Sequence, residues 1–169
     1  MNPMSKIGAV PSRPSLDNVF YRPSSAAPTA NGAPRWLEWS GSGRILVVDD
    51  EEAVRIVVSR VVERLGFTAE LASDGDEAIS LYSNDPTRFV LALVDVRLPG
   101  VNGIDIAREF RHLRPELPIV LMSGYTRHET TSPHPVQNPI GFLQKPFTLE
   151  TLATAVRIAL EPQLRRESR

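Results

Sequence analysis

The chain has 169 residues, 41% of them hydrophobic and 23% charged, which is typical of a soluble globular protein with one domain of ordinary size. It contains no cysteine, and this excludes disulfides and thiolate zinc sites. Residues 44–161 carry 12 basic and 17 acidic side chains, so direct nucleic-acid binding is not expected. No apolar stretch could span a bilayer and residues 1–15 lack a secretory signal, which predicts a cytoplasmic protein without membrane association.

The first 43 residues differ in composition from the rest of the chain. They are rich in Pro, Ser and Ala, hold six of the fifteen prolines and show no apolar period. Such a segment buries too little surface to offset its ordering entropy, which predicts a disordered arm over residues 1–43. It contains both tryptophans, Trp36 and Trp39. We interpret this pair as part of a short segment that packs on the domain surface or as a relic of a longer parent protein. The alternative is a short partner-binding motif.

From Arg44 to Glu161, short apolar runs alternate with helical patterns. The expected strands cover residues 45–48, 67–71, 90–94, 119–122 and 140–144. The expected helices follow these strands. The first has inward-facing residues at 54, 57, 58, 61, 62 and 65 and ends at Gly66. The inward-facing residues of the later helices are Ala78, Ile79 and Tyr82, then Ile106, Phe110 and Leu113, and finally Leu149, Leu152, Val156 and Leu160. Pro99 and Gly100 predict a turn, and residues 162–169 form a basic tail.

Alternating strand and helix units with right-handed connections predict an α/β fold. We expect a doubly wound, five-stranded parallel sheet of the flavodoxin-like (βα)5 type, with strand order 2-1-3-4-5. In this order the first and third strands are neighbours at the point where ligands bind, beyond the carboxyl ends of the strands.

Polar groups stand at the ends of four of these predicted strands. Asp49 and Asp50 follow the first strand, Asp95 the third, Ser123 the fourth and Lys145 the fifth. Parallel strands end at one edge of a sheet, so these side chains are expected to meet there. Three clustered carboxylates repel one another unless a cation intervenes, and oxygen ligands without Cys or His favour Mg²⁺. Such a site suits phosphoryl transfer.

The motifs in this region resemble those of response-regulator receiver domains of two-component and phosphorelay signalling. The resemblance covers residues 44–161 and depends on the combination of Leu46-Val-Val-Asp-Asp-Glu51, Val94-Asp-Val-Arg-Leu-Pro-Gly100 with Gly103, Met122-Ser-Gly124 and Lys145-Pro-Phe147. Two phrases, Ser123-Gly-Tyr-Thr126 and Phe142-Leu-Gln-Lys-Pro-Phe147, are similar to those of receivers attached to hybrid sensor kinases. The chain is therefore expected to be a stand-alone relay protein or a segment of such a kinase.

The resemblance implies a role for each site residue. Asp95 would be the phosphoacceptor, and the Mg²⁺ would be held by Asp50 directly, by Asp49 mostly through water, by Asp95, and by the backbone carbonyl of Arg97. Lys145 would balance the charge of the phosphate. Ser123 would bind a phosphoryl oxygen, with Phe142 as the switch aromatic. Arg97 and Tyr125 would tune the lifetime of the phosphorylated state.

The resemblance also implies partners. A sensor histidine kinase or a histidine phosphotransfer protein would supply the phosphoryl group, and an unidentified downstream protein would receive the signal because no output domain is visible. We expect no enzymatic activity beyond Mg²⁺-dependent self-phosphorylation and autodephosphorylation, and a monomer or weak dimer. Residues 126–139 contain three prolines where the family has its fourth helix, which predicts a short or frayed helix.

Two other functions stay open on the sequence. Receiver folds can lose their chemistry and serve as phosphorylation-independent interaction modules. A Mg²⁺-dependent phosphatase with an aspartyl-phosphate intermediate would share the acids and the lysine, but such enzymes have an Asp-x-Asp pattern, and Asp95-Val-Arg97 lacks the second acid.

Overall fold

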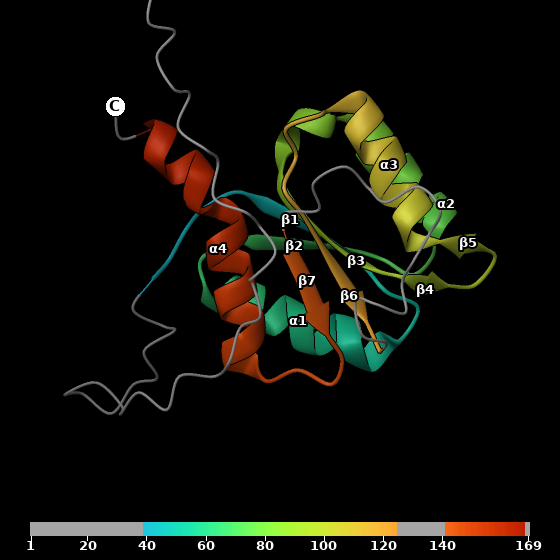
Figure 1. The fold of residues 1–169 in the computed structure, drawn as a ribbon, viewed down its shortest axis with the longest axis horizontal. Coiled ribbons are helices and arrows are strands. Elements are labelled where there is room, and N and C mark those ends of the chain that lie inside the picture. The colour runs from blue at the N-terminus through green and yellow to red at the C-terminus, as the bar shows by residue number, and fades with distance from the viewer. Residues whose placement is uncertain (1–38, 125–140, 168–169) are drawn as a thin grey trace, which may run out of the picture.

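The computed structural model describes residues 39–124 and 141–167. Five parallel strands form one sheet in the order β2-β1-β3-β6-β7 (Figure 1). Their bounds are β1 Arg44–Val48, β2 Thr68–Ala72, β3 Phe89–Asp95, β6 Ile119–Ser123 and β7 Gly141–Gln144. Counted along this sheet alone, the order is 2-1-3-4-5, so the predicted doubly wound fold is confirmed.

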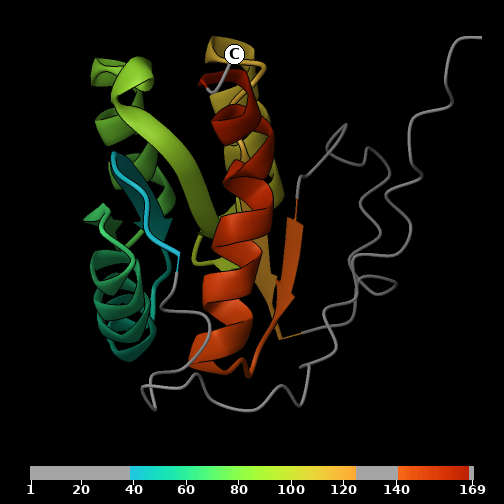
Figure 2. The same ribbon diagram turned by 90° about the vertical axis from the view of Figure 1, so that its left-hand side faces the viewer.

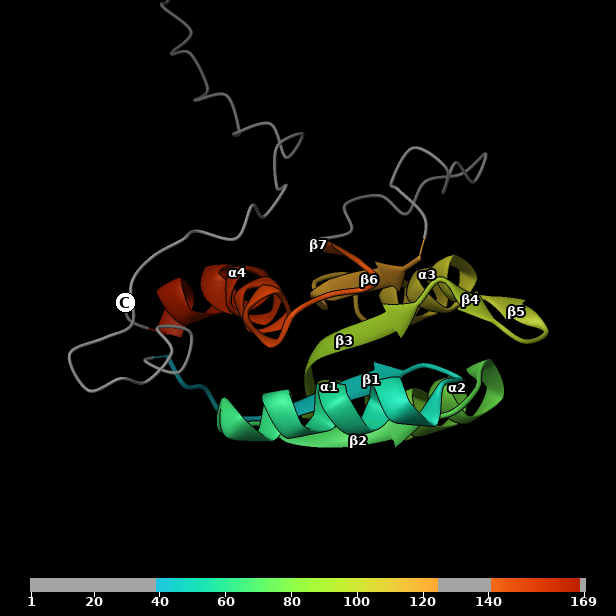
Figure 3. The same ribbon diagram turned by 90° about the horizontal axis from the view of Figure 1, so that it is seen from below.

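Helices cover both faces of the sheet. One apolar core joins α1 (Glu52–Arg64) and α4 (Leu149–Glu167) to the sheet, and the other joins α2 (Gly75–Asn84) and α3 (Gly103–Leu113) to its opposite face. Figure 2 shows α4 alongside β7, and Figure 3 shows α1 lying along β1 and β2. The central strands read as nearly continuous apolar runs because both of their faces are buried.

Three residues predicted to face inward are instead exposed. Val57, Leu113 and Leu149 expose 42%, 48% and 49% of their surface. Leu113 is the last residue of α3 and Leu149 the first of α4, so each lies beyond the end of the packed stripe. Val57 precedes the fully buried Val58 and is rotated about 100° away from the packed face of α1.

A small antiparallel hairpin separates β3 from α3. It pairs β4 (Arg97–Leu98) with β5 (Val101–Asn102), and Gly100 lies between them with a φ of 79°. The turn at Pro99 and Gly100 is confirmed, but two-residue strands have no period by which the sequence could reveal them. The Asn102 side chain accepts a hydrogen bond from the Ile104 N–H and so begins α3.

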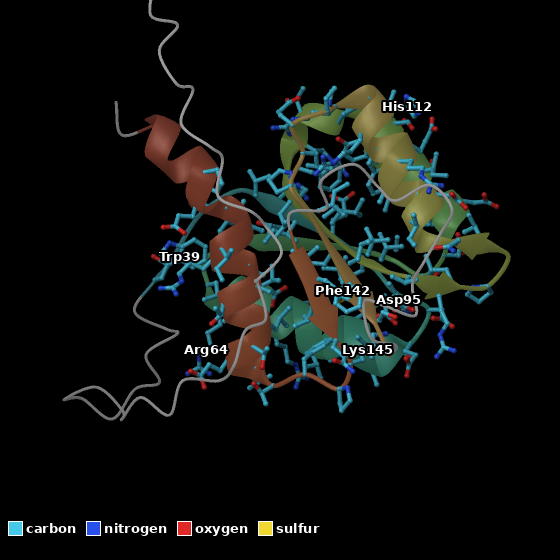
Figure 4. All side chains as sticks on the ribbon, viewed as in Figure 1. Trp39, Arg64, Asp95, His112, Phe142 and Lys145 are labelled. Atoms are coloured by element: carbon cyan, nitrogen blue, oxygen red, sulfur yellow. The ribbon has the colours of Figure 1, made fainter. Side chains whose placement is uncertain are left out.

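Trp39 packs on the domain surface, close to α4 and far from Asp95 (Figure 4). Its ring centroid lies 5.7 Å from that of Phe67, and the Gly41 N–H donates to the Leu65 carbonyl at 2.8 Å. The packed interpretation therefore holds for Trp39. The rest of the predicted arm, Trp36 included, lies outside the described residues.

At the other end of the chain, α4 continues through Pro162 to Glu167, so the helix includes most of the stretch that the sequence assigned to a tail. One proline removes a single N–H donor from a helix, and here the helix runs on beyond it. Tyr125 and the predicted frayed helix at 126–139 lie outside the described residues. Within the described residues, no helix combines the length and hydropathy that a membrane span requires.

Candidate functional site

Three carboxylates meet at the carboxyl end of the sheet. Val48 of β1 pairs in register with Val94 of β3, so the residues that follow these two positions lie side by side. Asp49, Asp50 and Asp95 each offer one oxygen, and these oxygens lie within 4.8 Å of one another. Asp49 and Asp95 are buried, whereas Asp50 is exposed to solvent.

Asp49 is held through all of its polar atoms. Its Oδ2 accepts a hydrogen bond from Lys145 Nζ at 2.7 Å, and its Oδ1 accepts one from the Glu51 N–H at 3.0 Å. The Asp49 carbonyl accepts from the Arg55 guanidinium at 2.6 Å, and its N–H donates to the Ala72 carbonyl at 3.2 Å. Asp49 is therefore a fixed buried charge that has little freedom to turn toward a ligand.

Lys145 reaches the acids from the loop that follows β7. Its backbone N–H donates to the Ser123 carbonyl at 2.7 Å, and its peptide bond to Pro146 is cis. Its Nζ lies 3.3 Å from Asp95 Oδ1, and the two side chains are seen together in Figure 4. Burial alone would lower the pKa of Lys145, but the hydrogen bond and charge of Asp49, together with the charge of Asp95, raise it. The ammonium therefore stays charged at neutral pH.

The electrostatics of the cluster favour a divalent cation. Burial, together with the charges of Asp49 and Asp50, raises the pKa of Asp95, and the attraction of Lys145 offsets this only in part. The carboxylates of Asp49, Asp50 and Asp95 and the ammonium of Lys145 together carry a net charge of −2 when all four are ionised. Oxygen donors only, of which one is solvent-exposed, fit Mg²⁺, which keeps several of its waters when it binds to proteins.

A pocket of about 870 Å³ opens over these acids. Its lining includes the charged residues Asp50, Asp95 and Lys145 and the hairpin residues Arg97 to Pro99. Apolar residues of α1 and of the loop after β7 also line it, namely Ala53, Val54, Val57, Pro146 and Phe147. Asp95 therefore lines a pocket together with a second acid, a lysine and an apolar surface.

The remaining predicted residues surround this pocket at different depths. Ser123 ends β6 and is 1% exposed, and Gly124 after it lines the pocket near the Arg97 guanidinium. Arg97 begins the hairpin two residues after Asp95. Phe142 is half-buried on β7 and packs against the core on the α2 and α3 face of the sheet; Figure 4 shows where it lies relative to Asp95 and Lys145.

Two residues near the acids had no role in the sequence interpretation. Glu51 lies 3.5 Å from Lys145 Nζ, and Arg55 donates to the Asp49 carbonyl. Glu51 directly follows the two acids in the Asp-Asp-Glu motif, so its position was a usable signal. Arg55 had none, because a contact between a side chain and a carbonyl six residues earlier depends on how α1 meets β1.

The fold and the acid cluster define a class: flavodoxin-like α/β proteins with a cluster of acids at the topological switch point that could hold a cation. The family model described as "Response regulator receiver domain" matches residues 45–157. This match covers more than half of the chain, and the chain belongs to that family. Receiver domains act in two-component signalling, where they accept phosphoryl groups from histidine kinases or phosphotransfer proteins, and they are typically signal transducers rather than enzymes.

Similar proteins include both kinases and regulators. The chain is 35% identical over 124 residues to the "Sensor kinase CckA" of Brucella abortus, covering 73% of this chain and 13% of that protein. It is 37% identical over 123 residues to the "Response regulator MprA" of Mycobacterium ulcerans, covering 70% of this chain and 50% of that protein. The chain thus spans half or less of the length of these relatives.

A solved structure gives the likeness in three dimensions. The response regulator TrrA of Thermotoga maritima, solved in complex with Mg²⁺ and BeF, superposes with a TM-score of 0.60 at 27% identity. The match covers 70% of this chain and 99% of that one.

Proposed function

We propose that the chain accepts a phosphoryl group on Asp95 from a phosphohistidine of a sensor kinase or of a histidine phosphotransfer protein. The observation that carries this proposal is that the Asp95 carboxylate lines a pocket and lies close to two further acids and a lysine. A resident Mg²⁺ would be held by Asp50, Asp95 and the Arg97 carbonyl, with Asp49 acting through water. TrrA, which was solved with Mg²⁺ and BeF, supports this assignment.

Each step of the transfer has a residue to perform it. An Asp95 carboxylate oxygen attacks phosphorus, the new O–P bond forms, the N–P bond breaks, and the leaving imidazole keeps the electron pair and takes up a proton. A Mg²⁺ held by these residues would neutralise charge on the phosphoryl oxygens. Lys145, already 3.3 Å from Asp95, pairs with the charge that the product adds, and Ser123 donates its hydroxyl to a phosphoryl oxygen.

The output depends on several contacts acting together. Phosphorylation adds about −1.5 to −2 charges, and reversing a 1:99 equilibrium needs about 5.5 kcal/mol. One hydrogen bond to a charged group contributes about 1.5 to 3 kcal/mol, so Ser123 alone is insufficient. Ser123 and Lys145 together move the chain after β6, and Phe142 on the neighbouring strand follows this change. Arg97 and Tyr125 set the lifetime of the phosphorylated state.

The biological setting of the proposal is a relay. The signal passes to a downstream protein or onward to another histidine, from a cytoplasmic monomer or weak dimer, as a stand-alone protein or within a hybrid kinase. The activity is limited to Mg²⁺-dependent self-phosphorylation and autodephosphorylation. The similarity to both CckA and MprA supports a place in two-component signalling.

Acetyl phosphate with Mg²⁺ tests the proposal directly. Phosphate that hydroxylamine removes is expected on wild-type protein and absent from Asp95→Asn, with Asp76→Asn as the matched control at an exposed acid of α2. If folded wild-type protein is not labelled by acetyl phosphate or by phosphohistidine donors, the proposal fails and a phosphorylation-independent interaction module is the remaining function. Sustained hydrolysis of unrelated phosphoesters would indicate a phosphatase.

A further inference from the structure

The first turn of α1 reaches back to the strand that carries two of the acids. The Arg55 guanidinium donates a hydrogen bond of 2.6 Å to the Asp49 carbonyl oxygen. That carbonyl belongs to the peptide unit that joins Asp49 to Asp50. Arg55 is itself half-buried, and its backbone N–H donates to the Glu51 carbonyl at 3.1 Å, so its own position is set by the start of the helix.

Other contacts hold the residues on either side of Asp50, through the side chain of Asp49 and through Glu51, but not the Asp50 side chain itself. Glu51, the N-cap of α1, makes no side-chain cap hydrogen bond, and its N–H is taken by Asp49 Oδ1 instead. Within residues 39–124 and 141–167, the exposed Asp50 carboxylate has no hydrogen-bond partner. The peptide plane before Asp50 contributes to the direction in which Asp50 points, and Arg55 holds the carbonyl end of that plane.

We propose that Arg55 is a positioning residue that orients the Asp49–Asp50 peptide so that the Asp50 carboxylate faces Asp95 and is ready for a divalent cation. The inference rests on the proposed function, since it assigns the cation to these acids. Partners that orient the ligands of metal sites have a large effect on affinity, typically 10- to 100-fold.

The charge and the hydrogen bond of Arg55 act on cation binding in opposite directions. A guanidinium near the acids repels a divalent cation, so removing its charge would tighten binding if charge were its only effect. Removing the hydrogen bond releases the Asp49–Asp50 peptide and weakens binding. The sign of the change in Mg²⁺ affinity therefore distinguishes a positioning role from an effect of charge alone. If Arg55 only stabilised the helix, its substitution would leave the Mg²⁺ affinity of the folded protein unchanged.

The test measures Mg²⁺ binding by titration calorimetry, without any phosphoryl donor. We expect Arg55→Gln to raise the Kd at least 10-fold and Arg55→Lys, which keeps a donor and the charge, to raise it less. Arg60→Gln removes the same charge from an exposed position on the same helix and is expected to stay within twofold of wild type. Circular dichroism confirms that each variant is folded at the temperature of titration. Arg55→Lys retains most of the apolar stem if Arg55→Gln does not fold.

A second readout uses the metal-free protein. Hydrogen exchange of the Glu51 amide, which donates to Asp49 Oδ1, is expected to be several times faster in Arg55→Gln than in wild type and unchanged in Arg60→Gln. An unchanged or lower Kd for Arg55→Gln overturns the inference, while the proposed function stands if wild type binds Mg²⁺ and accepts phosphate on Asp95. Failure of wild type to bind Mg²⁺ overturns both.

Discussion

Gly103 is the first residue of α3 and lies directly behind the proposed phosphoacceptor. A Cβ atom at this position would lie 1.9 Å from the Asp95 carbonyl oxygen and 2.8 Å from its carbonyl carbon. Carbon and oxygen atoms approach to about 3.3 Å, so Gly103→Ala requires α3 and the end of β3 to separate by roughly 1.4 Å. Both are backbone elements, and the Gly103 N–H also donates to the Val96 carbonyl at 2.9 Å, so neither gives way easily.

Two losses are expected from this substitution. Overpacking costs about 1 to 3 kcal/mol, against which alanine regains up to about 1 kcal/mol of helix propensity, so a net loss of stability is expected. The displaced Asp95 carboxylate is no longer correctly placed relative to Lys145 and the other acids. A misplacement of about 1 Å can lower a reaction rate on the order of 100-fold, so slower phosphorylation is expected. The assay is the rate of phosphate incorporation from acetyl phosphate with Mg²⁺, alongside a urea unfolding curve.

Gly141 offers a matched control. It begins β7, and the atoms nearest to a Cβ there belong to the Val120 side chain, the closest at 3.1 Å, so a shift of a few tenths of an ångström relieves this contact. We expect Gly141→Ala to lose some stability and to phosphorylate at nearly the wild-type rate. A Gly103→Ala protein that matches wild type in both rate and stability would show that the end of β3 is softer than these distances imply, and the reasoning would be wrong.

Three further predictions concern buried charges and hydroxyls. Tyr82 is fully buried, its hydroxyl has no hydrogen-bond partner among the residues that the structure describes, and burial raises its pKa to about 12. Tyr82→Phe should therefore raise the free energy of unfolding by about 1 kcal/mol, and a lower urea midpoint would contradict this. The pKa of Asp95 is raised in the folded protein. Without a metal ion, the free energy of unfolding therefore falls as the pH rises from the pKa of an Asp in the unfolded chain, about 3.9, through the pKa of Asp95 in the folded protein. In EDTA at pH 7, urea unfolding should therefore give Asp95→Asn a higher free energy of unfolding than wild type. The expected difference is about 1.4 kcal/mol for each unit by which the pKa of Asp95 in the folded protein exceeds its pKa in the unfolded chain, and it should vanish at pH 3. A difference that does not change with pH would refute this cause. Lys145→Met should bind Mg²⁺ several times more tightly, because the ammonium competes for the Asp49 and Asp95 oxygens, yet phosphorylate more slowly; weaker Mg²⁺ binding by calorimetry would refute that competition.

The strand order and the meeting of the acids could be predicted before any coordinates were known. Apolar runs such as Ile45 to Val48 and Leu91 to Val94 are strong local signals, because a strand buried on both faces has no polar positions. Once these strands are parallel, the residues that follow them share one edge, and Asp49, Asp50 and Asp95 need no further information to converge.

Contacts that depend on how separate elements pack could not be predicted in this way. The Arg55 contact to the Asp49 carbonyl, the close approach of Gly103 to Asp95 and the outward turn of Val57 all depend on the angles and distances at which helices meet the sheet. Residue periodicity records which face of an element is apolar, since burial acts on each side chain separately. Periodicity does not record the exact distance between two backbones. That distance depends on many side chains at once and is set only when the whole core is packed.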